Sequence, residues 1–497
     1  MSRIAFFEAR EHWDLAAALR ASKPGNLFPS RVAWSAVQDN GQFLTVLDGH
    51  ASAGFDVGPV ELVPVPKMDG TTRPAADMRM EDQVLYAALV HAVRSRLHRG
   101  LVEFTGEEHS YLEFETFPLM TDESPAYVLS ADVVSFYEYI DHDVLAYELL
   151  GLTGLAETPD SLTDLLKVWL GSTRGLPQGP ASSQPLADIY LSRASRTLAR
   201  AGFEHSRYVD DFRVPVSSWG EALRAKLVLE QSLRSIELAL SASKVWILKA
   251  ETYKRWLARI PRNEQADPNA LEHVGFDPDA YGGSSAYVLD VSADDAAQAL
   301  EIFEEQIAKR QLDLMGTRRM RWALPRLAYS ESIRPIAEFS TLMRRYGHIT
   351  QTVAIYLQLL MGSDLEGSAV EAVLDWIETA GFRFEWQVGW LLHAMIYTTE
   401  QSQRLAAVSE HILADDSLPW FVRGQAALAL ATERALPDQQ RYFDIYERAP
   451  AATQPDLLGA VVVGRPRWGS AFIKGASTTP LLAAVAELEP AEYFAWV

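Results

Sequence analysis

The pattern of hydrophobic and polar positions divides the chain into two parts. Over residues 1–260, short apolar runs typical of strands alternate with amphipathic runs typical of helices, with turns rich in glycine and proline between them. The sequence AYVLSADVVSFY, residues 126–137, predicts a buried strand followed by a turn. The sequence SRYVDDFRVPV, residues 206–216, predicts a β-hairpin with two acidic residues near its turn. We therefore predict an α+β domain over residues 1–260.

Two amphipathic runs in this part predict helices, at residues 182–202 and 219–240. Ser182 or Ser183 can cap the first helix, because a hydroxyl oxygen can accept hydrogen bonds from the free N–H groups of the first turn. Gly202 suits the end of the same helix.

The second part of the chain is predicted to be helical. Residues 261–290 are rich in Pro, Gly, Asn and Asp, which predicts a linker. Beyond residue 290 the strand pattern fades, and helical segments of about 12 to 18 residues follow with short breaks. Each is amphipathic or nearly all apolar, as stacked helix pairs would be, so we predict an all-α, HEAT-like helical-repeat domain over residues 291–497. No motif recurs at a fixed period, and an irregular helical bundle is the alternative.

Composition narrows the class of protein. The chain has 497 residues, of which 48% are hydrophobic and 22% charged, as in ordinary globular proteins. No apolar run approaches the roughly 18 residues of a membrane-spanning helix, and the acidic residues near the N-terminus do not fit a signal peptide. The lack of cysteine excludes disulfides, thiolate zinc sites and a cysteine nucleophile. We expect a cytoplasmic protein without membrane contacts.

The formal net charge of −21 restricts how the chain can bind nucleic acid. Tight, non-specific binders of duplexes are usually basic, because phosphate contacts dominate affinity. A nucleic-acid function must therefore use local basic patches or bind weakly. One such patch lies in residues 309–327, with Arg318, Arg319 and Arg321 beside Trp322, a residue that could stack on a base. We interpret it as a candidate path for a product strand or an RNA, with an ordinary solvated helix face as the alternative.

Asp210 and Asp211 stand side by side in the predicted hairpin. Adjacent carboxylates repel each other, so stability alone does not explain the pair in a buried strand. A Tyr-x-Asp-Asp string is nevertheless a weak signal by itself, since it arises by chance in roughly one chain of this length in twenty. Its meaning depends on the segments around it.

Four further segments give the pair its meaning. In chain order they are KMDGTTRP with Lys67 and Arg73, LSADVVSFY with Asp132, Phe136 and Tyr137, LPQGPASS with Gln178 and Gly179, and SASKVWIL with Lys244. Together with the Tyr-Val-Asp-Asp string, their order and spacing resemble the reverse transcriptase family over roughly residues 60–250. The resemblance implies a right-hand polymerase fold with fingers and palm in residues 1–260. It also implies an RNA-directed DNA polymerase, a nucleotidyltransferase that acts on dNTPs.

The resemblance implies roles for the acidic residues. Nucleotidyl transfer uses two metal ions about 3.5–4 Å apart, one activating the attacking 3′-oxygen and one holding the triphosphate. Mg²⁺ prefers oxygen ligands and keeps several waters, so a few carboxylates suffice, and Mn²⁺ is a possible replacement. Asp132 and Asp210 are expected to bind the metal ions, and Asp211 completes the signature with a less direct role. Lys244 is expected either to protonate the leaving pyrophosphate or to cap a strand.

The same resemblance implies a site for the incoming dNTP. The two cations of KMDGTTRP are expected to hold the triphosphate, because charge-assisted contacts suit phosphate oxygens. The Gln-Gly pair is expected to pack under the nucleotide, where glycine allows a close backbone approach. One aromatic residue is expected to clash with a ribose 2′-OH and so to select dNTPs; Tyr137 is the first candidate and Phe136 the alternative. The expected dNTP-binding residues are Lys67, Arg73, Phe136, Tyr137, Gln178 and Gly179.

The helical second part indicates a group within this family. A helical region in place of a basic thumb is similar to the bacterial abortive-infection and phage-defence-associated reverse transcriptases. That similarity implies a role in antiviral defence and assembly as a homo-oligomer. In some members of the group DNA synthesis needs no template and is primed on a protein tyrosine, so the single-stranded DNA product stays covalently attached. A protein that does not clamp a long duplex needs fewer cations, in keeping with the negative charge.

Two alternatives to untemplated synthesis remain. The chain could copy a bound non-coding RNA, as retrons do. It could also be a scaffold whose helical repeats bind a partner while the polymerase site is silent.

Overall fold

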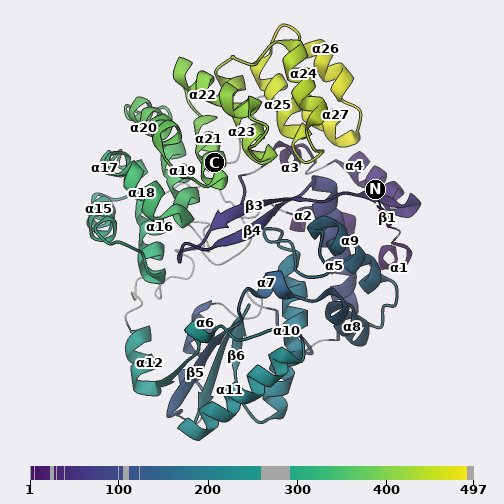
Figure 1. Ribbon diagram of the computed structural model, residues 1–497, viewed down its shortest axis with the longest axis vertical. Helices are drawn as coiled ribbons and strands as arrows, with labels where there is room; N and C mark the ends of the chain where they lie inside the picture. The colour runs from purple at the N-terminus through teal and green to yellow at the C-terminus, as the bar shows by residue number, and fades with distance from the viewer. Residues whose placement is uncertain are drawn as a thin grey trace. The chain divides into compact units, whose positions relative to one another are not determined.

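The computed structural model of the chain describes residues 2–4, 6–22, 27–29, 31–37, 40–98, 100–104, 111–122, 124–258 and 291–489 (Figure 1). They form two compact units. Unit 1 comprises the described residues of Met1–Ser22, Leu47–Val60 and Glu81–His273, and unit 2 those of Lys23–Val46, Glu61–Met80 and Val274–Val497. Unit 2 thus takes in two segments, 23–46 and 61–80, that the sequence analysis placed in the polymerase domain. The predicted linker, residues 261–290, lies outside the described residues.

Unit 1 mixes strands and helices. Its strands are β1 (Ser2–Ile4), β2 (Phe55–Val57), β5 (Tyr127–Asp132), β6 (Ser206–Tyr208), β7 (Asp211–Val216) and β8 (Trp246–Lys249). Its helices are α1 (Phe7–Arg10), α2 (Leu15–Ala21), α5 (Met80–Arg96), α6 (Tyr111–Thr116), α7 (Phe136–Tyr139), α8 (His142–Thr153), α9 (Thr158–Leu170), α10 (Ser183–Arg200), α11 (Trp219–Arg234) and α12 (Ala250–Leu257), with 3-10 turns η1 (Phe117–Leu119) and η2 (Ala242–Lys244). Helix α4 (Gly41–Ala53) has residues in both units.

A four-stranded antiparallel sheet in the order β6-β7-β5-β8 forms the centre of unit 1. Helix α11 packs against β5 and β7, and α10 packs against α11 (Figure 1). Val128 and Leu129 of β5 are fully buried, as expected of a central strand. The burial of β5 fixes its register and with it the position of Asp132 at the strand end.

The structure confirms the predicted hairpin and both predicted helices of the first part, with two corrections. Helix α10 begins at Ser183, but neither serine side chain caps it: Ser182 makes no capping hydrogen bond, and the Ser183 hydroxyl donates to the carbonyl of Pro177 instead. The second helix, α11, ends at Arg234, short of the predicted residue 240. Leu240 instead forms an isolated β-bridge with Val133.

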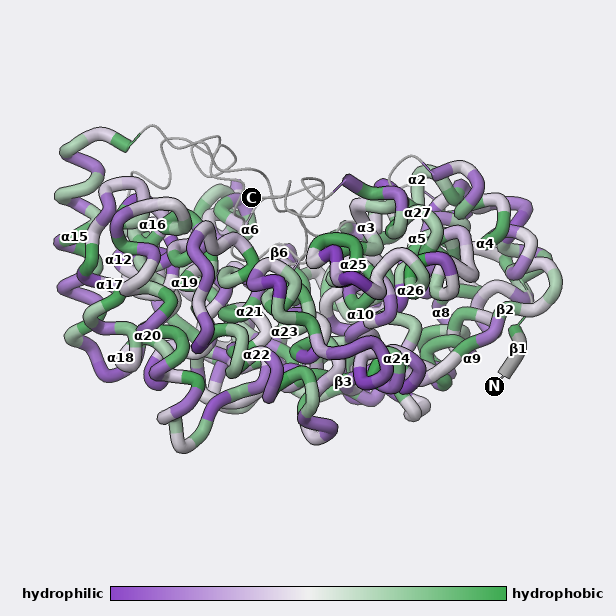
Figure 2. Tube along the Cα trace, turned by 90° about the horizontal axis from the view of Figure 1, so that it is seen from above, coloured by the Kyte–Doolittle hydropathy of each residue, from purple (hydrophilic) through white to green (hydrophobic). Residues whose placement is uncertain are grey.

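Unit 2 contains one hairpin and many helices. The hairpin pairs β3 (Glu61–Pro66) with β4 (Thr72–Asp77). The helices are α3 (Val32–Val37), α15 (Ala293–Ile307), α16 (Leu314–Tyr329), α17 (Arg334–Ala337), α18 (Phe339–Arg345), α19 (Thr350–Leu359), α20 (Glu366–Thr379), α21 (Glu385–Met395), α22 (Gln403–Ala414), α23 (Trp420–Thr432), α24 (Gln439–Arg448), α25 (Gln454–Gly464), α26 (Gly469–Ala476) and α27 (Pro480–Glu487), with the 3-10 turn η3 (Gly347–Ile349). Hydrophilic and hydrophobic residues alternate along α15, as the amphipathic pattern requires (Figure 2).

The helices beyond residue 290 pack in two rows, each of which follows the order of the chain. One row runs through α16, α19, α21, α23, α25 and α27, and a second runs through α18, α20 and α22. Every regular element in the described residues 291–489 is helical, which confirms the predicted helical region. The finer expectation of a HEAT-like repeat stays a prediction. None of the described helices is both long and apolar enough to cross a membrane.

Buried polar contacts hold the hairpin of unit 2 to these helices. The Arg31 guanidinium lies 3.1 Å from Asp77 at the end of β4 and 3.2 Å from Asp456 on α25. The backbone N–H of Trp420, at the start of α23, donates to Glu61 of β3 at 2.9 Å. All three acidic side chains come from different elements, so these contacts join the N-terminal segment, the hairpin and the C-terminal helices into one unit.

Candidate active site

Strand pairing brings two acidic residues face to face at one end of the central sheet. Asp132 is the last residue of β5, and its register partner is Asp211, the first residue of β7. Side chains of directly opposed residues in an antiparallel pair lie about 4.5–5.5 Å apart at Cβ. Asp210 occupies the adjoining turn, where its carbonyl accepts a hydrogen bond from the N–H of Val133 at 3.2 Å. The three aspartates predicted from the sequence therefore gather at one end of the sheet.

The turn that carries Asp210 has an unusual backbone. Val209 has φ of 51°, a left-handed conformation that is costly for a β-branched residue. The carbonyl of Val209 accepts a hydrogen bond from Arg207 at 2.8 Å. Arg207 in turn forms a fully buried ion pair with Asp188 of α10, with 2.7 Å between Nη1 and Oδ1. A buried ion pair thus holds the turn in the conformation that presents Asp210.

The three aspartates place negative charge where water has limited access. Burial raises the pKa of Asp210, and the charges of Asp211 and Asp132 raise it further. Burial also raises the pKa of Asp211, although the nearby Arg213 acts in the opposite direction. Carboxylates with raised pKa values are short of compensating positive charge. The site therefore favours a bound cation.

Lys244 supplies one positive charge to this site. Its Nζ donates to Oδ2 of Asp132 at 2.9 Å, and the backbone N–H of Ser241 donates to the Asp132 carbonyl at 2.8 Å. Burial lowers the pKa of Lys244, but the hydrogen bond to Asp132 and the charges of the three aspartates outweigh this effect and raise it overall. The structure thus brings the predicted lysine to the predicted acid, with its side chain still largely exposed to solvent at 61%.

The aspartates suit magnesium by chemistry and charge. Mg²⁺ is commonly held by about one or two carboxylates together with water and substrate phosphates. As the side chains stand, no group of three or more His, Cys, Asp or Glu residues in the described part of the chain surrounds a common point for an ion. Asp132 instead faces Lys244. The residues fit a divalent ion that brings ligands from its substrate, and do not form a complete protein cage.

A buried polar network lies behind Asp211. Arg213 has its guanidinium 3.5 Å from Oδ1 of Asp211, and it also forms a close ion pair with Glu115 of α6. Tyr111 and Tyr253 donate hydrogen bonds to Glu115 at 2.8 and 2.7 Å. This network was not predicted from the sequence. The period of two along a strand places Arg213 on the same face as Asp211, and that spacing was the available signal.

The predicted aromatic pair and the Gln-Gly pair are neighbours in unit 1. The backbone N–H of Leu176 donates to the carbonyl of Tyr137 at 2.8 Å, which joins α7 to the loop between α9 and α10 that carries Gln178 and Gly179. Phe136 and Tyr137 are both buried, Tyr137 slightly less so at 8% exposed than Phe136 at 2%. Gln178 is buried, and Gly179 has φ of 121°, a conformation that requires glycine. The choice between Tyr137 and Phe136 as the sugar-selecting residue stays a prediction.

The two predicted triphosphate-binding cations belong to unit 2. Lys67 lies at the tip of the β3–β4 hairpin, where its N–H donates to the Thr71 carbonyl at 2.7 Å. Arg73 lies opposite Val65 in the same hairpin. The tip also contacts the connection between α15 and α16, since Gln311 donates to the Met68 carbonyl at 3.2 Å.

The basic patch of α16 lies in unit 2 as well. Arg319 is paired with Glu305 at 2.7 Å, and Arg318 and Arg321 are half-buried. The Arg326 guanidinium lies 4.0 Å from the centre of the Trp322 ring, so one face of this indole is already occupied. These contacts reduce the charge and the stacking surface available to nucleic acid. The proposed nucleic-acid path over Arg318, Arg319 and Arg321 stays a prediction.

Sequence comparison agrees with the geometry of the site. Residues 65–260 match the family described as Reverse transcriptase (RNA-dependent DNA polymerase). The match contains the hairpin cations, the aromatic pair, the Gln-Gly pair, all three aspartates and Lys244. No curated protein matches the chain. Residues 65–260 are therefore a reverse transcriptase domain.

Proposed function

We propose that the chain is a DNA polymerase that joins dNTPs by metal-dependent nucleotidyl transfer and acts in antiviral defence. One observation carries the chemical part of the proposal: Asp132 and Asp211 are register partners at the sheet end, with Asp210 in the adjoining turn and the pKa of both hairpin acids raised. A polymerase domain of the reverse transcriptase type needs carboxylates in this arrangement.

Each residue has a role in this proposal. Asp132 and Asp210 would hold divalent metal ions, which when bound activate the attacking 3′-hydroxyl and neutralise the triphosphate. Asp211 is positioned by Arg213 and adds negative charge to the site. Lys244 lies beside Asp132 with a protonated amine that can donate to a departing phosphate oxygen. The ring of Tyr137 would exclude nucleotides that carry a ribose 2′-OH.

The remaining dNTP contacts are assigned by motif. Lys67 and Arg73 would bind the triphosphate, and the loop at Gln178 and Gly179 would support the nucleotide. We assign these four roles from the family match of residues 65–260.

The experiment that tests the chemistry is incorporation of labelled dNTPs by the purified full chain with Mg²⁺ and, separately, Mn²⁺. Asp210→Asn should abolish incorporation, because a neutral amide replaces a metal-binding carboxylate. Asp143→Asn is the matched control, since this aspartate lies on α8 with a side chain that is 91% exposed. Full activity of Asp210→Asn would remove the two-metal assignment.

Within this function we propose synthesis without a template, primed on a protein tyrosine, in a homo-oligomer. The net charge of −21 and the helical region of unit 2 support it, because neither suits a long duplex. Incubation with dNTPs alone, followed by a denaturing gel with and without protease, tests it. Labelled DNA whose mobility changes with protease supports covalent priming, and light scattering gives the oligomeric state.

A second candidate is RNA-templated synthesis, and the RNA-dependent description of the matching family favours it. Here the chain would carry a non-coding RNA through purification. Product that forms only when this RNA is present, together with one enriched RNA species on sequencing, would favour templated synthesis and contradict the untemplated proposal.

A further inference from the structure

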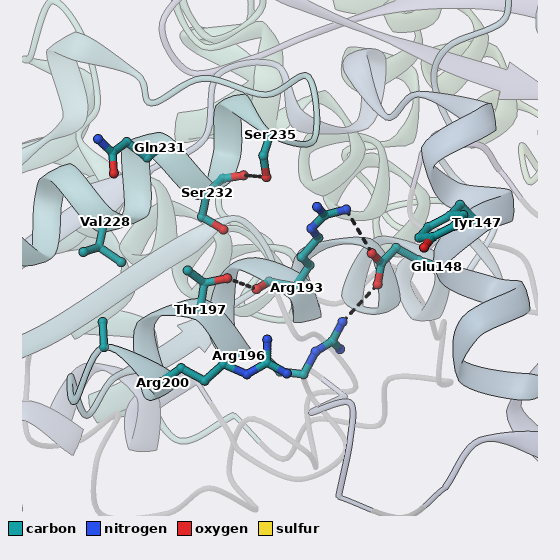
Figure 3. Close-up of a pocket in the computed structure, with 11 residues that line it drawn as sticks. Tyr147, Glu148, Arg193, Arg196, Thr197, Arg200, Val228, Gln231, Ser232 and Ser235 are labelled. Carbon is teal, nitrogen blue, oxygen red and sulfur yellow. Dashed lines mark hydrogen bonds and ion pairs between the residues drawn. The ribbon is translucent and has the colours of Figure 1, made fainter.

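A pocket of 770 Å³ opens between three helices of unit 1 (Figure 3). Its lining comes from α8, from the C-terminal half of α10, and from the C-terminal half of α11. None of the three aspartates of the candidate active site lines it. Its volume lies within the range of about 300–1,000 Å³ typical of small-ligand sites. The pocket is therefore a separate feature of the polymerase domain.

The pocket is positively charged in an acidic protein. Arg193, Arg196 and Arg200 recur at helical spacing and so lie along one face of α10. Glu148 is the one acid among the lining residues, and its two oxygens accept from Arg193 at 3.3 Å and Arg196 at 2.9 Å. Arg200 has no ion pair within the described residues. Since each guanidinium carries five N–H donors, both paired arginines keep donors for a ligand.

Ser232 gives the second, independent indication of a ligand. Its residue is only 5% exposed, yet its hydroxyl has no hydrogen-bond partner in the described structure. Figure 3 shows this hydroxyl directed into the pocket. The hydroxyl groups of Thr197 and Ser235 in the same lining are used locally, as Thr197 donates to the Arg193 carbonyl and Ser235 to the Ser232 carbonyl. A buried hydroxyl without a partner is costly, so an oxygen atom of a ligand is the expected acceptor.

The rim of the pocket adds an aromatic surface. Tyr147 of α8 lines the pocket and is 70% exposed. An exposed aromatic ring beside arginines can stack on a base whose phosphate is bound by the guanidinium groups. Gln231 of α11 contributes a side-chain amide to the same lining.

We propose that this pocket binds a nucleotide unit, with its phosphate at Arg193, Arg196, Arg200 and Ser232 and its base at Tyr147. The unit is either a free nucleotide or part of a single strand, since both present a phosphate beside a base. The inference does not rest on the polymerase activity, because binding is measured without incorporation.

The test measures binding to the full chain in EDTA, which keeps metal-dependent triphosphate binding out of the measurement. A fluorescent oligothymidylate is titrated by anisotropy, and dTMP is titrated by calorimetry. Arg200→Glu should weaken binding about tenfold, because a charge-assisted phosphate contact becomes a repulsion. Ser232→Ala should weaken it severalfold while leaving the melting temperature unchanged or higher. Arg255→Glu is the control, since Arg255 is an exposed arginine of α12 outside the pocket.

The outcomes separate the possible ligands. Weaker binding of both probes by Arg200→Glu and Ser232→Ala supports a site for free nucleotides. Weaker binding of the oligothymidylate alone, with a further loss in Tyr147→Ala, supports a site for a single strand. Equal losses in Arg200→Glu and Arg255→Glu with no effect of Ser232→Ala would show a non-specific charge effect and overturn the proposal, as would unchanged binding by all pocket variants.

Discussion

The guanidinium group of Arg213 contacts both carboxylate oxygens of Glu115, at 2.8 and 3.2 Å, with both side chains buried. Hydrogen bonds from Tyr111 and Tyr253 hold the same carboxylate. Arg213 therefore bridges the buried carboxylate of Glu115 and the carboxylate of Asp211, whose Oδ1 lies 3.5 Å from the guanidinium. The position of Asp211 therefore depends on Arg213 and on the buried side chains that hold Arg213 in place.

Replacing Arg213 with methionine should raise the pKa of Asp211, because the charge of Arg213 lowers this pKa more than that of Lys244 does. Incorporation of dNTPs should then fall at a higher pH on the acid side of its pH profile. The variant should also lose about 3–5 kcal/mol of unfolding free energy, since Glu115 is left buried and unpaired. A pH–rate profile and denaturant unfolding measure the two effects.

Arg213→Lys provides the matched control for that substitution. It keeps the positive charge and loses the two-pronged contact, so its acid limb should stay near that of the wild type while its stability falls. An acid limb that shifts equally in both variants would contradict the electrostatic role of Arg213.

We expect Asp210 to make the metal-free protein less stable as pH rises. Its pKa in the fold is raised from the ordinary 3.8 to about 7, so across this window the folded state binds more protons than the unfolded state. Stability should therefore be greatest at the acid end of the window and fall toward neutral pH. Asp210→Asn should reduce this fall, while the raised pKa values of Asp211 and Asp456 keep part of it, and should stabilise the metal-free protein by about 1–3 kcal/mol at neutral pH. Thermal unfolding in EDTA across this pH range is the measurement.

Mg²⁺ gives the complementary test of the same carboxylates. It should raise the melting temperature of the wild type more than that of Asp210→Asn, because a ligand of the folded state stabilises it by mass action. Equal stabilisation of both proteins by Mg²⁺ would place the ion elsewhere.

Lys244→Ala should lower the maximal rate of incorporation by about 10²–10⁴-fold if the amine donates a proton to the departing phosphate. A smaller loss, without a change in the solvent isotope effect, would indicate that Lys244 only balances the charge of Asp132. Lys254→Ala is the control, since Lys254 is a half-exposed lysine on α12 away from the three aspartates.

Tyr137→Ala should admit ribonucleotides, because it removes the ring proposed to clash with a 2′-OH. Steady-state incorporation of paired dNTPs and rNTPs should show discrimination reduced by about 10–100-fold. Tyr137→Phe should keep the selectivity, since the ring remains. Unchanged discrimination in Tyr137→Ala would assign the clash to Phe136 or to another residue.

Much of the local structure around the site could be predicted from the sequence. The apolar run that ends at Asp132 predicts a strand, and the two acids between apolar residues predict the hairpin; the structure contains both. These patterns depend on neighbours in the chain, which a sequence displays directly. The predicted serine cap of α10 was wrong. Ser182 makes no capping hydrogen bond, and the Ser183 hydroxyl donates to Pro177, in a loop whose position the sequence pattern does not predict.

The contacts that the sequence did not predict join residues far apart in the chain. Glu115 lies 98 residues before Arg213, and no local pattern connects them. Arg207 and Asp188 are closer in sequence, yet their pairing depends on how α10 packs beside the hairpin. The grouping of residues 23–46 and 61–80 with the C-terminal helices has the same origin, in buried contacts such as that between Arg31 and Asp456.

The hairpin of Lys67 and Arg73 is built into the helical unit through Arg31, Asp77 and Asp456. Fusing residues 65–260 to a different helical region would therefore remove the buried ion-pair partners that hold this hairpin in place. A chimera that keeps these contacts must exchange residues 23–46 and 61–80 together with the C-terminal helices. These three separate stretches of sequence form one structural unit.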